Sequence, residues 1–215
     1  MIYYELIQGS PEWFAVKCGK VSGSRMPDIV ATTKSGYGAS RKNMLATIVC
    51  EWLTNTMAET FSNTAMQRGT EKEPLARVEY ETFKGVMVDQ VGFVDHPDIP
   101  MAGASPDGYV GKLDELLVEI KCPNTATHIE TLTTKEIDKR YIIQMQWQMA
   151  CTGAKATDFV SFDDRLPEGL QLFVKRVERD NEMIAMLEKE ARKFLEEVQE
   201  TTEKLELIRE QNVKN

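Results

Sequence analysis

The sequence predicts an α/β fold with a central mixed β-sheet flanked by helices, followed by a long C-terminal helix. Two observations support this prediction. Within residues 1–178 the order of segments is helices, three consecutive strands, a helix and two further strands, which is typical of α/β folds. From Ile184 onward, apolar residues recur at nearly heptad spacing among charged residues, and this pattern predicts one amphipathic helix.

The helices of the N-terminal third are predicted from capping residues and from helical spacing of apolar residues. Ser10-Pro11 is typical of an N-cap followed by the first helical position. A second helix is expected over 22–31, and a polar, glycine-containing surface loop over 32–39. A long helix is expected over 40–57, capped by its first residue, a serine, and a further helix over 64–83.

The strands are predicted from short apolar runs rich in β-branched residues. Three strands are expected in succession, over 86–94, 101–110 and 116–121, so that the second and third are neighbours in the sheet. The remaining elements are a helix over 135–151 and two strands over 157–162 and 170–177.

The chain is expected to form one domain over 1–178, with 179–215 as an amphipathic C-terminal helix. The favoured interpretation is that this helix packs on its own domain, and the alternative is a contact with another subunit. A coiled-coil dimer fits less well, because Thr201-Thr202 interrupts the apolar seam.

The composition is that of a globular protein: 215 residues, 42% hydrophobic and 28% charged. No apolar run approaches the ~20 residues that a membrane-spanning helix needs, and the N-terminus lacks the basic start and apolar stretch of a signal peptide. Four separated cysteines and two histidines argue against a disulfide framework, a zinc ribbon or a histidine-rich metal site. We therefore expect a cytoplasmic protein without a membrane partner.

The formal net charge of -8 disfavours DNA binding over the whole surface, but the charge is unevenly distributed. Residues 1–45 carry six Lys or Arg against three acidic residues, whereas residues 178–215 carry eleven acidic against seven basic residues. This asymmetry predicts a basic N-terminal face suited to a phosphate backbone and an acidic tail. The alternative is a scattered, solvated surface.

An aspartate, a glutamate and a lysine are spaced as phosphodiester hydrolysis requires. Asp107 lies in a Ser-Pro-Asp-Gly turn, Glu119 lies within an apolar strand, and Lys121 follows on the same strand face. Two carboxylates suit a hard cation such as Mg²⁺, with Mn²⁺ as a possible substitute. Such a cation lowers the pKa of bound water and stabilises charge on the phosphate. The Ile120 side chain is expected to enter the core, while its carbonyl completes the metal shell.

The spacing alone also fits a hairpin with a solvated aspartate and lysine. The catalytic interpretation is favoured because a glutamate inside an apolar strand is costly unless it is paired or binds a metal.

Four motifs in the same order are similar to those of the lambda-exonuclease family, phage recombination nucleases of the PD-(D/E)XK superfamily. The resemblance covers roughly residues 10–175. Its motifs are Glu12-Trp13 with Lys17–Gly19 and Val21–Ser24; Arg68–Pro74; Ala104–Gly108 with Val118–Pro123; and Tyr141–Met149.

The resemblance implies Mg²⁺-dependent 5′-to-3′ degradation of duplex DNA from a 5′-phosphorylated end, releasing mononucleotides and leaving 3′ single strands for recombination. It also implies a homotrimeric ring, a single-strand annealing protein as partner, and a phage or prophage origin. Glu73 would reach a metal ion through water, and Gln144 would position the attacking water. Lys17, where the family usually has an arginine, would hold the 5′-phosphate. The remaining DNA-contacting residues would be Ser24, Arg25 and Tyr141.

Two other classes of function remain open from the sequence. One is an endonuclease or branched-structure nuclease on the same core, because the motif defines the hydrolytic centre and not the path of the substrate. The other is a non-catalytic DNA-binding protein. The intact set of Asp107, Glu119 and Lys121 makes this second alternative less consistent with the sequence.

Overall fold

The predicted α/β fold with a mixed sheet is confirmed. The structure, a computed structural model, describes residues 1–34, 36–58 and 64–213, with the side chains of 64–66 excepted. The main sheet has four strands in the order β6-β7-β8-β9, in which the β7–β8 pair is parallel and the outer pairs are antiparallel. Its strands are β6 (Gly108–Val110), β7 (Leu116–Lys121), β8 (Ala156–Phe162) and β9 (Leu172–Glu178).

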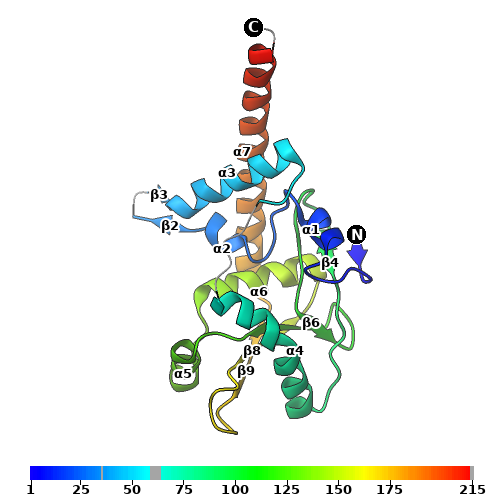
Figure 1. Ribbon diagram of the computed structural model, residues 1–215, viewed down its shortest axis with the longest axis vertical. Helices are drawn as coiled ribbons and strands as arrows, with labels where there is room; N and C mark the ends of the chain where they lie inside the picture. The colour runs from blue at the N-terminus through cyan, green and yellow to red at the C-terminus, as the bar shows by residue number, and fades with distance from the viewer. Residues whose placement is uncertain (35, 59–63, 214–215) are drawn as a thin grey trace.

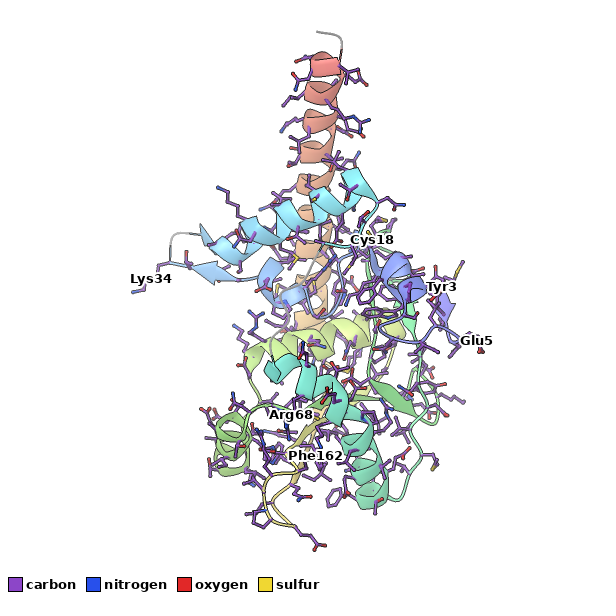
Figure 2. All side chains as sticks on the ribbon, in the orientation of Figure 1. Tyr3, Glu5, Cys18, Lys34, Arg68 and Phe162 are labelled. Carbon is purple, nitrogen blue, oxygen red and sulfur yellow. The ribbon has the colours of Figure 1, made fainter. Side chains whose placement is uncertain are left out.

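Two smaller antiparallel units lie beside the main sheet. Three short strands form a sheet in the order β1-β4-β5: β1 (Ile2–Tyr3), β4 (Phe93–Asp95) and β5 (Gly103–Ala104). A hairpin of β2 (Thr32–Thr33) and β3 (Gly36–Tyr37) extends from the body, and Figure 2 shows Lys34 near its far end, directed outward.

Seven helices surround these sheets in the part of the chain that the structure describes. They are α1 (Pro11–Lys17), α2 (Met26–Ile29), α3 (Ala39–Thr54), α4 (Thr64–Lys84), α5 (Thr125–Thr134), α6 (Lys139–Thr152) and α7 (Asn181–Val213). Helix α4 contacts β7, β8 and β9, and α6 contacts β8. In Figure 1, α7 runs past α3 and continues beyond the rest of the molecule.

The alternation of β7 side chains assigns its two faces to different helices. Val118 and Ile120 are buried in a core with Ala76 and Tyr80 of α4. This confirms that the Ile120 side chain points into the core. The intervening residues, among them Glu119, therefore face the opposite side of the sheet, where α6 packs. A second core joins α3, α6, α7 and the small sheet through Ile48, Trp147, Leu187 and Phe194, with other apolar residues.

The N-terminal elements differ in extent from those predicted. The helix expected over 22–31 is reduced to α2, and residues 23–25 before it form a turn. Val21, which precedes this turn, forms backbone hydrogen bonds with Met101 and Gly103. The expected loop over 32–39 contains the β2–β3 hairpin, and its residue 35 lies outside the described residues. Gly38, not Ser40, is the N-cap of α3, which ends at Thr54.

The predicted strands before β7 are shorter or broken. The strand expected over 86–94 is reduced to β4 and an isolated bridge between Asp89 and Tyr109. The strand expected over 101–110 is divided into β5 and β6, with Pro106, which has no backbone N–H for a ladder, lying between them. Helix α5 was not predicted, because its threonine-rich sequence has low helix propensity. It is capped by Asn124, which accepts from the Thr127 amide at 2.9 Å.

The C-terminal half agrees more closely with the prediction. Helix α6, expected over 135–151, begins four residues later, at Lys139, and ends at Thr152, with Gly153 (φ 78°) as its C-cap. Helix α7 buries one face against its own domain, whereas Leu205 and Ile208 are exposed. The buried residues are Ile184, Leu187, Ala191, Phe194 and Val198. Residues 214–215 of the predicted tail helix lie outside the described residues. None of the described helices is both long enough and apolar enough to cross a membrane.

Candidate active site

The β6–β7 register brings Asp107 and Glu119 together, as the sequence predicts. Gly108 of β6 pairs with Val118 of β7, and the two strands are antiparallel. Asp107, the residue before Gly108, therefore lies opposite Glu119, the residue after Val118. The Asp107 carboxylate accepts a hydrogen bond from the Ile120 amide at 2.7 Å. In an antiparallel ladder the N–H and C=O of one residue face the same neighbouring strand, so the Ile120 carbonyl is directed to the edge that Asp107 occupies.

Glu119 is fully buried and is held by three donors. Gln144 donates to Oε1 and Gln148 donates to Oε2, each through its side-chain amide at 2.6 Å. Lys121 forms an ion pair with Oε1. The two glutamines are one helical turn apart on α6 and therefore present their amides to the same carboxylate. A carboxylate has about four lone-pair positions, so about one remains for a further partner.

The charges at this site shift one another's pKa values. Burial and the neighbouring carboxylates of Glu119 and Glu73 raise the pKa of Asp107 well above its usual range. Burial lowers the pKa of Lys121, but the neighbouring carboxylates of Glu119 and Asp107 raise it by more. The pKa of Lys121 is therefore above the usual range for lysine. Lys121 is therefore an ammonium ion at neutral pH.

The donor set fits a hard divalent cation. Asp107, Glu119 and the Ile120 carbonyl supply oxygen ligands, and Mg²⁺ usually takes one or two protein carboxylates and keeps several waters. The crowding that raises the pKa of Asp107 is the kind of repulsion that a cation relieves. Among the described residues, no three His, Cys, Asp or Glu side chains are grouped closely enough to form a complete metal site. The fit therefore rests on two carboxylates, one carbonyl and water.

Glu73 approaches this centre from α4 and is held by another partner. Its carboxylate accepts from Arg77 at 2.7 Å. Burial raises the pKa of Glu73, the Arg77 guanidinium lowers it, and the negative charge of Glu119 raises it further. Its predicted role, an indirect contact with a metal ion, stays a prediction.

A pocket of about 150 Å³ is lined by Asp107 and by the two glutamines that bind Glu119, and it contains residues from the predicted phosphate-binding set. It places Lys17 and Ser24 beside Asp107 and Gln144, although the segments come from distant parts of the chain. Its lining consists of Gln8, Trp13, Lys17, Ser22, Gly23, Ser24, Ser105, Asp107, Gln144 and Gln148.

Trp13 anchors α1, and with it Lys17, beside the Asp107 turn. Its indole N–H lies 2.9 Å from the Gly92 carbonyl and 2.9 Å from the Ser105 hydroxyl. The Lys17 ammonium lies 4.3 Å from the centroid of the Trp13 ring, a cation–π contact. Burial, assisted by the nearby charge of Arg25, lowers the pKa of Lys17 to about 8.

Arg25, which was predicted to bind phosphate, is engaged elsewhere. Its guanidinium forms a buried ion pair with Glu51 of α3 and also donates to the Lys20 carbonyl at 3.0 Å. Glu51 accepts in addition from the Gly19 amide at 2.7 Å. Arg25 does not line the pocket, and the structure assigns it to holding the segment that carries Ser22 and Ser24.

Tyr141 likewise lies outside the pocket. Its ring stacks on Phe159 with centroids 5.7 Å apart, and the Lys121 ammonium lies 5.3 Å from the tyrosine ring. The contact places Tyr141 next to Lys121. The predicted contact between Tyr141 and DNA stays a prediction.

Half of the basic residues of the predicted N-terminal face form ion pairs. Three of its six basic residues are engaged: Lys20 with Asp95, Arg25 with Glu51, and Arg41 with Glu190 and Glu197. Positive charge near Asp107 and Glu119 therefore comes from Lys17 and Lys121. The uneven distribution of charge in the sequence predicts more unpaired positive charge in residues 1–45 than the structure shows.

Comparison with known proteins agrees with this architecture. The family model described as the YqaJ-like viral recombinase domain matches residues 12–155, and no curated protein matches the chain. The crystal structure of an alkaline exonuclease (LHK-Exo) from Laribacter hongkongensis has 50% identity and a TM-score of 0.86, with 94% of this chain and 99% of that chain covered. The complex of LHK-Exo with dAMP gives a TM-score of 0.87 at the same identity and coverage.

A third structure shows the fold alone. A phage related exonuclease from Haemophilus somnus 129PT has 18% identity and a TM-score of 0.69, with 86% of this chain and 96% of that chain covered. Because the family model spans more than half of the chain, and the likeness to LHK-Exo extends over nearly all of it, the chain belongs to the YqaJ-like viral recombinase domain family.

Proposed function

We propose that this protein is a Mg²⁺-dependent exonuclease that degrades one strand of duplex DNA in the 5′-to-3′ direction and leaves a 3′ single strand for recombination. Its family and its 50% identity to an alkaline exonuclease support the coarser conclusion that it is a DNA exonuclease. The observation that carries the finer proposal is the convergence of Asp107, Glu119 and Lys121 beside the pocket that contains Lys17.

Each residue of the centre has a role that follows from its position. A bound Mg²⁺ or Mn²⁺, held by Asp107, Glu119 and the Ile120 carbonyl, would stabilise charge on the phosphate and make its bound water more acidic. Lys121 orients the attacking water and offsets negative charge, because an ammonium with a raised pKa donates hydrogen bonds and does not accept a proton. Gln144 fixes the orientation of Glu119.

The adjoining pocket suits a terminal phosphate. A water molecule takes about 30 Å³ in the liquid, so a pocket of about 150 Å³ has room for a phosphate group with some water. Lys17 supplies a positive charge and Ser24 supplies a hydroxyl donor from opposite segments of the lining. Recognition of a 5′-phosphate here would place the first phosphodiester next to the two carboxylates.

The proposal is tested with linear duplex DNA labelled at each end, with and without a 5′-phosphate. Mononucleotides should be released from the 5′ end in the presence of Mg²⁺, faster from the phosphorylated substrate. Internal fragments, or cutting of a closed circle, would support an endonuclease instead. If wild-type protein bound DNA equally with and without metal and never cut it, a binding role would remain.

Lys17 predicts a particular pH dependence. The affinity for a 5′-phosphorylated end should fall as the pH rises through about 8, because Lys17 is charged below this pKa and neutral above it. Lys17→Arg should remove that fall, since a guanidinium stays charged throughout this range. The measurement is the dissociation constant of 5′-phosphorylated duplex from about pH 7 to about pH 9, without a catalytic metal. A 5′-hydroxyl duplex is the control, and identical profiles for the two proteins would contradict the assignment.

We also propose that the protein forms a homotrimeric ring and works with a single-strand annealing protein. The exposed end of α7 supports a protein contact, with Leu207 60% and Ile208 51% exposed beyond the buried part of the helix. A monomeric mass in light scattering across the working concentration range would contradict the ring.

A further inference from the structure

Gln148 is a buried residue for which the proposed catalytic roles do not yet account. It lies on α6, one turn after Gln144, and is 1% exposed. Its side-chain N–H donates to Glu119 Oε2 at 2.6 Å. Its side-chain carbonyl oxygen, Oε1, is buried and has no hydrogen-bond partner among the described residues. A buried acceptor without a partner is costly, so its retention requires an explanation.

Exchanging the oxygen and nitrogen of the Gln148 side-chain amide would not give both atoms hydrogen-bond partners. That exchange would direct the carbonyl oxygen at the Glu119 carboxylate, which accepts hydrogen bonds and donates none. The N–H is therefore committed to Glu119, and the oxygen must find its donor elsewhere.

The polar space next to Gln148 is the pocket that Asp107 also lines. Gln148 lines the pocket together with Ser22, Ser24, Lys17 and Asp107. The segment opposite packs closely on α6 at this point, because a Cβ added to Gly23 would lie 3.5 Å from the Gln148 Cγ. A polar pocket of about 150 Å³ has room for ordered water, which commonly satisfies buried polar atoms.

We propose that Gln148 is a positioning residue that couples the metal-binding carboxylate to the phosphate pocket. Its N–H fixes the rotamer of Glu119, and its Oε1 would accept a hydrogen bond from water held in the pocket when a divalent cation is bound. This inference rests on the proposed function. A neutral amide is suited to both tasks at once, whereas a methionine offers neither contact and a glutamate has no N–H for Glu119.

Gln146 provides a matched control on the same helix. It is 2% exposed, donates to the Glu178 carbonyl at 2.8 Å and accepts from the Asp180 amide at 2.9 Å. Its contacts join α6 to the end of β9 and to the residue before α7, and neither involves Asp107 or Glu119. Gln146→Met therefore removes a buried amide of equal size without changing the surroundings of Glu119.

The experiment compares Gln148→Met with Gln146→Met in two measurements. The first is the affinity of metal-free protein for Mn²⁺, by calorimetry or by electron paramagnetic resonance. The second is kcat and KM on 5′-phosphorylated duplex at saturating metal. Gln148→Met should weaken Mn²⁺ binding by about 10- to 100-fold and lower kcat more than it raises KM, as for other residues that orient metal ligands. Gln146→Met should keep both values within about twofold, even where its thermal stability falls.

Wild-type metal affinity and kcat in Gln148→Met would overturn the inference, and so would equal losses in both variants. If Gln148→Met does not fold, Gln148→Asn keeps the amide one methylene shorter. It should then show weakened Mn²⁺ affinity in folded protein, and unchanged affinity would overturn the inference. A wild-type protein that neither binds Mn²⁺ nor cuts DNA would refute the proposed function itself, which distinguishes the two failures.

Discussion

Replacing Lys121 with methionine should lower the rate of DNA cleavage by about 10²- to 10⁴-fold, the range for loss of a positioned acid–base or electrostatic group. Methionine preserves the length and apolar part of the side chain but removes the ammonium that pairs with Glu119. Glu119 keeps its two glutamine donors, so the carboxylate stays oriented while the charge beside the attacking water is lost.

The measurement for Lys121 is single-turnover cleavage of end-labelled duplex at saturating Mg²⁺, together with the affinity for the same DNA. Binding should change little, because Lys17 and Ser24 line the pocket proposed to hold the 5′-phosphate and Lys121 does not. Lys175→Met is the matched control, since Lys175 lies on β9, is exposed and donates to the Lys135 carbonyl. A loss of less than about tenfold would rule out a direct role for Lys121 in the chemical step.

Asp107→Asn should abolish metal-dependent cleavage while making the metal-free protein more stable at neutral pH. Removing one of two carboxylate ligands removes several kcal/mol of charge stabilisation, which corresponds to a rate loss of about a thousandfold or more. The stability gain has a different origin. Burial and the Glu119 carboxylate raise the pKa of Asp107, so its ionised form destabilises the fold.

The sign of this effect follows from linkage. A carboxyl whose pKa is higher in the folded than in the unfolded state favours folding at low pH, and its contribution becomes unfavourable as the pH rises above the unfolded value. Asparagine removes that penalty and can still accept the Ile120 amide. Thermal unfolding with and without Mg²⁺ tests both parts: Mg²⁺ should raise the Tm of wild type and not that of Asp107→Asn.

Asp114→Asn is the control for this experiment, because Asp114 is exposed between β6 and β7 and does not line the pocket. It should retain cleavage and the Mg²⁺-dependent rise in Tm. A metal-free Asp107→Asn protein that is less stable than wild type would show that the carboxylate is stabilising and that its pKa is not raised.

The hydrolytic centre was predictable because its geometry depends on local rules. A two-residue period places Glu119 and Lys121 on one face of β7 and Ile120 on the other. A turn between consecutive strands then brings Asp107 opposite Glu119. The mixed sheet, the capped start of α1 and the glycine end of α6 follow from equally local signals.

The surroundings of that centre depend on side chains that meet across the fold. Arg25 carries a basic charge suited to phosphate, yet Glu51 of α3 binds it, and nothing in either local sequence indicates that pair. Likewise, the spacing of Gln144 and Gln148 shows a shared helix face, but only the packing of α6 on the sheet directs that face at Glu119.

The amino-acid sequence thus determined the relative placement of four residues, because strand alternation and turn geometry act over a few residues. They are Asp107, Glu119, Ile120 and Lys121. The pocket around Lys17, the role of Arg25 and the position of Gln148 were decided by tertiary structure. Each of these features depends on which charged or amide side chain lies nearby in the fold. A buried charge or amide without a partner costs free energy, so its partner determines its role.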